Sequence, residues 1–65
     1  MITYAIVFFE HFSYLWEKCF YAFECVTRTP ETFTEVEIPT REGVFKGVVV
    51  AITDTPEYPV GVYKF

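Results

Sequence analysis

The sequence lacks most of the side chains from which catalytic sites are built. It contains no asparagine or glutamine, and one copy each of serine, histidine and aspartate, namely Ser13, His11 and Asp54. A Ser-His-Asp triad would need these three side chains to meet in an oriented chain of hydrogen bonds. The three glycines are isolated from one another, so there is no glycine-rich phosphate loop. We therefore expect a protein that is not an enzyme.

Basic residues are also few. Lys and Arg total five against nine Asp and Glu, the formal net charge is −4, and no two basic residues are adjacent. Proteins that bind nucleic acid usually carry a basic patch that neutralises phosphates. The missing amide side chains also remove the contacts that read adenine. The charge balance disfavours nucleic acid and favours a protein partner.

The chain offers few metal ligands and no long apolar run. Cys19, Cys25 and His11 are fewer than the four ligands that a structural zinc ion requires. The uncharged stretch 1–9 is too short to cross a bilayer and has no basic region before it. A 65-residue domain also encloses too little volume for a large cofactor. We expect no metal, no cofactor, no membrane association, and a cytoplasmic location with reduced thiols.

Strand-forming segments rich in β-branched and aromatic residues dominate what is present. Three segments are expected to be strands, residues 2–9, 32–38 and 44–53, and residues 60–65 are expected to form either a last strand or a free tail. The second alternates, which places Val36 and Ile38 on one face and Phe33, Glu35 and Glu37 on the other. The proline that follows is expected to end this strand, because proline has no amide donor.

Two glycines are assigned to bends. Gly43 closes the hairpin loop Thr40–Gly43, where a positive φ is expected. Gly47 lies inside the strongest strand and predicts a bulge or a sharp bend, as at the corner of a small barrel.

The segment 10–26 fits two structures. Apolar residues recur with helical spacing at Phe12, Leu15, Trp16, Cys19, Phe20 and Phe23. With alternating spacing, the same segment forms a hairpin that turns at Glu17–Lys18, and its aromatic content favours strands. We expect one domain over residues 1–65 that is mainly β, either a small five-stranded open barrel or a curled antiparallel sheet. The alternative is an α+β fold with one helix at about 11–25.

Aromatic residues exceed what so small a domain can bury. Fourteen of the 65 residues are aromatic (eight Phe, five Tyr and one Trp), and each ring has about 150–250 Å² to bury. A domain of this size hides only about 60 % of its unfolded surface, so some rings should remain exposed as a contact surface. The candidate partner-binding residues are Phe12, Tyr14, Trp16, Phe20, Tyr58 and Tyr63.

Residues 34–50 resemble a known module. They comprise a strand TEVEIP, a turn TREG and a strand KGVVV. This order resembles the last two strands of the N-terminal DNA-binding domain of the PriA replication-restart helicases, and similar stand-alone phage modules. The resemblance implies a five-stranded barrel and contact with a nucleic-acid end. The basic surface of that family is missing here, so no binding residue is carried over.

The composition leads to three functional hypotheses. The first is a non-enzymatic module that docks on a larger protein through an aromatic surface, as an accessory factor or a phage-type inhibitor. The second is single-stranded nucleic-acid binding by aromatic stacking on a β-barrel face. The third is a structural subunit of a homo-oligomer.

Overall fold

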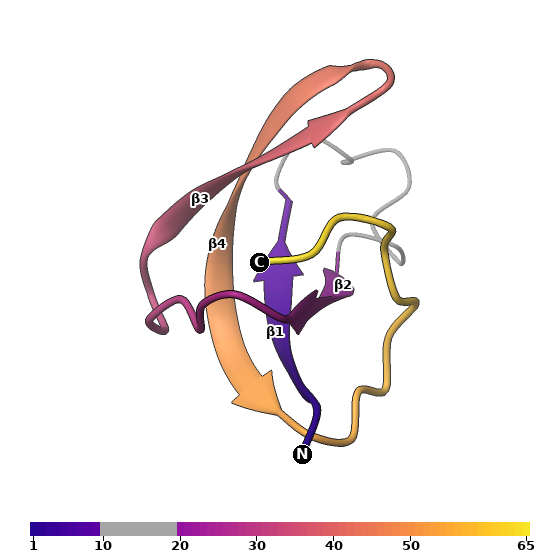
Figure 1. The fold of residues 1–65 in the computed structure, drawn as a ribbon. Helices are drawn as coiled ribbons and strands as arrows, with labels where there is room; N and C mark the ends of the chain where they lie inside the picture. The colour runs from indigo at the N-terminus through magenta and orange to yellow at the C-terminus, as the bar shows by residue number, and fades with distance from the viewer. Residues whose placement is uncertain (10–19) are drawn as a thin grey trace.

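The computed structural model describes residues 1–9 and 20–65. Within these ranges, four strands form one antiparallel sheet in the order β2-β1-β4-β3 (Figure 1): β1 (Thr3–Phe8), β2 (Phe20–Cys25), β3 (Glu35–Thr40) and β4 (Gly43–Thr53). The described residues contain no helix, and hence none of the length and apolarity that a membrane span requires. The expected mainly β class, with a curled antiparallel sheet, is confirmed.

The helical alternative for 11–25 is wrong over its second part. Residues 20–25 form β2, which pairs with β1 along its whole length. Tyr21 and Phe23 both pack toward the core from one face of this strand, as the hairpin interpretation requires. Residues 10–19, including the turn expected between the two strands, lie outside the described residues.

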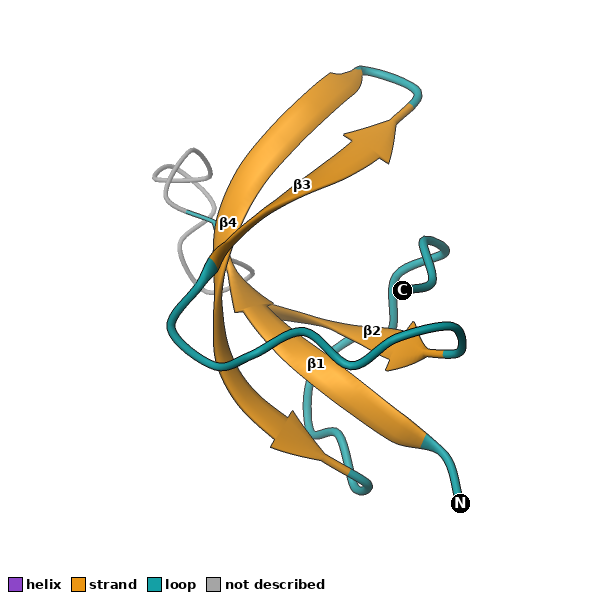
Figure 2. Ribbon diagram, turned by 60° about the vertical axis from the view of Figure 1, so that its left-hand side comes forward, coloured by secondary structure: helices purple, strands orange, loops and turns teal. Residues whose placement is uncertain are grey.

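The long strand β4 serves both halves of the sheet, because its first half pairs with β3 and its second half with β1. The register with β1 shifts where Ile6 opposes Ala51 and Val7 opposes Val49, so Val50 is an extra residue. A β-bulge of this kind bends its strand and increases the local twist. Figure 2 shows β4 curving so that the β3–β4 hairpin rises away from β1 and β2.

The bulge expected at Gly47 therefore occurs three residues later, at Val50. Gly47 has a different role, since a Cβ atom there would lie 2.9 Å from the Phe8 carbonyl oxygen and 2.5 Å from Val7 Cγ1. The missing side chain allows β1 and β4 to approach closely. The expectation for Gly43 is confirmed, because it has a φ of +122° at the hairpin.

The core lies on the inner face of the curled sheet. Its buried members are Ala5, Val7, Phe9, Phe23, Val36, Ile38, Val49 and Phe65. The two apolar residues of β3 are buried and its two glutamates exposed, as their alternation predicts. The extra residue Val50 resets the alternation in β4, so that Ile52 rather than Ala51 packs against the core.

The outer edge of β2 is covered by residues 59–65. The amides of Gly61 and Phe65 donate to the carbonyls of Ala22 (2.8 Å) and Glu24 (2.9 Å). Neither alternative for residues 60–65 describes the segment, because it forms a single parallel bridge with β2 rather than a full strand and is held against β2 rather than free. Its Phe65 side chain is only 3 % exposed.

Candidate functional site

β3 is preceded by a backbone irregularity at Phe33. The Phe33 amide donates to the Val49 carbonyl (2.5 Å), and the Val49 amide donates to the Thr34 carbonyl (3.0 Å), so two residues oppose one. In a bulge of this kind the first residue has a left-handed conformation and is usually glycine. Phe33 has a φ of +64° and is 80 % exposed. A strained backbone therefore holds an aromatic ring in solvent.

The hydrogen bonds at this bulge fix which backbone groups of β3 face β4. Along an antiparallel ladder, every second residue exchanges backbone hydrogen bonds with the neighbouring strand. Because the Thr34 carbonyl accepts from β4, the backbone groups of Glu35, Glu37 and Pro39 point away from β4, toward the free edge of β3. Within the described ranges, no further backbone hydrogen bond reaches these three residues. The expectation that Pro39 ends the strand is wrong, because the amide it lacks belongs to the unpaired edge.

An open groove lined by aromatic rings lies beside the second half of β3. It has a volume of about 410 Å³. We call it the aromatic groove, and its apolar lining includes Phe9, Tyr21, Phe23, Ile38, Phe45 and Tyr63. Phe9 and Phe23 are buried beneath it and pack edge to face, with centroids 6.0 Å apart at 81°, an arrangement that aromatic pairs prefer. The rings of Tyr21, Phe45 and Tyr63 are half-buried and leave part of their surface exposed in the groove.

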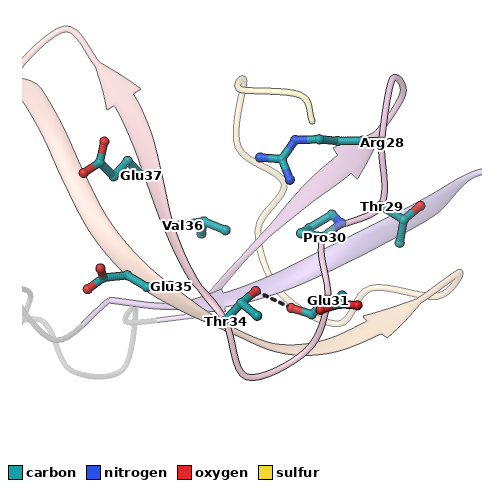
Figure 3. Close-up of a pocket in the computed structure, with 8 residues that line it drawn as sticks. All are labelled: Arg28, Thr29, Pro30, Glu31, Thr34, Glu35, Val36 and Glu37. Carbon is teal, nitrogen blue, oxygen red and sulfur yellow. Dashed lines mark hydrogen bonds between the residues drawn. The ribbon is translucent and has the colours of Figure 1, made fainter.

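A second, polar groove of about 500 Å³ lies beside the first half of β3. We call it the acidic groove. Figure 3 shows residues 35–37 of β3 on one side of it, with Arg28 and Glu31 on the loop at the other side. The Val36 side chain points toward this loop, whereas the carboxylates of Glu35 and Glu37 point to the opposite face of β3. Arg28 also lies over the Phe65 ring, 5.1 Å from its centroid, a cation–π contact that holds the guanidinium near the core. The residues that border this groove include three glutamates and one arginine, and two of the glutamates, Glu35 and Glu37, place their carboxylates on the outer face of β3.

Metal binding is not indicated by this arrangement. In the part of the chain that the structure describes, no group of three or more His, Cys, Asp or Glu side chains is placed to hold a metal ion. The Thr34 hydroxyl donates to the Glu31 carbonyl (2.6 Å), which fixes the loop at the rim of the acidic groove. Consecutive residues of β3 line the two grooves, and we call the grooves together with the outward edge of β3 the seam.

The residues singled out from the sequence fall into three places. Three of them lie outside the described residues: Phe12, Tyr14 and Trp16. Phe20 and Tyr58 come together on the outer face of the sheet, stacked with centroids 5.2 Å apart at 28°, and Phe8 packs on the same Phe20 ring at 5.1 Å. Tyr63 lies apart from this cluster, in the aromatic groove.

Sequence analysis did not select Phe33 as a functional candidate, although a signal was present. The alternation of 32–38 places Phe33 on the same face as Glu35 and Glu37, where a large apolar side chain meets water rather than core. The groove walls had no comparable signal, because they come from segments far apart in the sequence. Comparison of the chain with protein-family models, curated proteins and solved structures found no match.

Proposed function

We propose that this chain is a non-enzymatic binding module that docks on a protein partner through the aromatic groove. The observation that carries the proposal is the half-buried state of Tyr21, Phe45 and Tyr63 around an open groove, above rings that are already packed. Tyrosine and phenylalanine are enriched in protein interfaces, and clustered aromatic anchors supply much of their binding energy.

The charge of the chain supports a protein partner. The net charge of −4 is opposed to phosphate binding and suited to a basic protein surface. A small acidic module of this kind is suited to act as an accessory factor or inhibitor of a larger enzyme. We propose the cytoplasm as its place of action, and the host cytoplasm if the protein is viral.

The proposal is tested with an exposed residue at the mouth of the groove. Val62 lines the groove and is 96 % exposed, so Val62→Glu adds a charge there without touching the core. Val44→Glu is the matched control, because Val44 is 61 % exposed and lies outside the groove lining. Partners are captured from native host extract with the unmodified chain, identified by mass spectrometry, and purified for titration calorimetry.

We expect Val62→Glu to raise the Kd of the captured partner at least about tenfold, since a charge would be buried against apolar surface. Val44→Glu should leave the Kd within about twofold, and both variants should keep the melting temperature of the parent chain. Equal binding by the two variants would refute docking through the groove.

The two alternative functions give different signals. Oligonucleotide binding would quench tyrosine and tryptophan fluorescence at low salt, and the quenching would disappear as salt rises. Self-association would give a mass by light scattering that is several times 7.6 kDa. Either result, without a captured protein, would replace the proposal.

A further inference from the structure

We infer that the partner is bound as an extended segment that adds to the free edge of β3, with basic side chains beside Glu35 and Glu37 and apolar side chains over the aromatic groove. This inference rests on the proposed function and specifies how the docking occurs. Binding of this type combines main-chain hydrogen bonds to a sheet edge with pockets for alternate side chains.

The first support is the state of the sheet edges. The edge of β2 is covered by residues 59–65, whereas β3 has no neighbour besides β4 in the described ranges. The amides and carbonyls of Glu35 and Glu37 point away from the sheet and are in reach of another strand. Pro39 removes one donor and limits the edge that can be paired to the first half of β3.

The second support is that the grooves flank the two halves of this same strand. The acidic groove includes residues 34–37 and the aromatic groove begins at Ile38. A segment paired with Glu35 and Glu37 would therefore continue directly over the aromatic rings. Of the four described strands, β3 is the one that contributes residues to both of these grooves.

The charge of β3 favours pairing with a segment of another protein over pairing with a second copy of this chain. Two copies joined about a twofold axis at β3 would bring Glu35 and Glu37 of one copy against the same glutamates of the other. Like charges directly opposite each other across strands are destabilising. A lysine- or arginine-containing segment of a different protein would instead place basic side chains beside the carboxylates of Glu35 and Glu37, on the outer face of the sheet.

The geometry also gives the order of residues in the partner. Antiparallel pairing is slightly more stable per residue than parallel pairing. In an antiparallel arrangement, the residues over the aromatic groove precede those beside Glu35 and Glu37. The segment that fits is therefore extended, apolar at its beginning and basic at its end.

The test uses the full 65-residue chain and an array of eight-residue peptides in which apolar and basic residues are placed in every order. The best peptide is then resynthesised with single N-methyl groups along its backbone. Glu37→Pro removes the outward amide of β3 while keeping an extended backbone, which an edge strand tolerates. Glu37→Gln is the matched control, because it keeps the amide and removes only the charge.

We expect peptides with apolar residues before basic ones to be selected. Methylation at every second amide should weaken binding about tenfold, with little effect at the amides between. Glu37→Pro should weaken binding to a similar degree. Glu37→Gln should weaken it only about two- to fivefold, and less as salt increases.

The outcomes separate this inference from the proposed function. If Val62→Glu abolishes peptide binding while N-methylation and Glu37→Pro do not, the groove binds its partner and the strand-addition inference is wrong. If no peptide binds although a folded partner is captured, the inference is also wrong. The methylation pattern does not depend on whether Glu37→Pro folds, so a misfolded variant does not prevent the decision.

Discussion

Replacing Phe33 by glycine should stabilise the protein, although it removes a large apolar side chain. Phe33 has a φ of +64°, and its side chain is 80 % exposed. A left-handed backbone costs an L-residue about 1–2 kcal/mol, and glycine adopts it without that penalty. The lost ring contributes little, because most of its surface is already in water.

The expected gain follows from two opposing effects. Glycine relieves about 1–2 kcal/mol of backbone strain and loses about 0.5–1 kcal/mol through the greater freedom of the unfolded chain. From the central values of these two ranges, the net stabilisation of Phe33→Gly is about 0.75 kcal/mol, which corresponds to a rise of about 3–6 °C in melting temperature for a domain of this size. Phe33→Ala keeps the strained conformation and should be no more stable than the parent chain.

Thermal melts followed by circular dichroism, together with urea titrations, measure both variants against the parent. The comparison of glycine with alanine isolates the backbone conformation, since both remove the ring. If Phe33→Gly were less stable than Phe33→Ala, the left-handed conformation would not be the source of strain, and the reasoning would fail.

Three further substitutions test the packing. Gly47→Ala should destabilise the fold by about 1–3 kcal/mol in urea titrations, because the new Cβ would lie 2.9 Å from the Phe8 carbonyl oxygen; an unchanged midpoint would mean that β1 and β4 are less close. Phe65→Ala should cost about 3–5 kcal/mol and leave much of the protein unfolded by circular dichroism, because this ring is 3 % exposed. Lys64→Ala should lower the free energy of unfolding by less than about 0.5 kcal/mol, because the 2.8 Å ion pair with Glu24 involves a lysine that is 55 % exposed. A larger decrease would show that this ion pair anchors residues 59–65 to β2.

The parts of the fold that sequence predicted are those with a local periodic signal. Val36 and Ile38 alternate with glutamates, and this pattern predicts a strand with one buried face and one solvent-exposed face. The apolar run at residues 2–9 also carries a local signal, because it combines β-branched and aromatic residues over the length of one strand and so indicates a buried strand.

The parts that sequence missed depend on partners far along the chain. The run Val48–Val49–Val50 is apolar throughout, so nothing in it marks which residue is extra, and the bulge at Val50 is set by pairing with β1 on one side and β3 on the other. Pro39 gives an ambiguous signal in the same way. Proline ends a central strand but is tolerated on an outward-facing edge, and its position on an edge is known only from the strand order.

The seam combines an open sheet edge with features that protect such edges from self-association. Unpaired edges invite pairing with any exposed strand, and proteins usually protect them with charge, proline or twist. Here Glu35 and Glu37 carry like charges, Pro39 removes a donor, and the bulge at Val50 twists the hairpin away from the rest of the sheet. Protection by carboxylates is selective rather than absolute, because it repels acidic strands, including copies of this chain, and attracts basic ones. The same two glutamates can therefore keep the protein from pairing with itself and select the segment that it accepts.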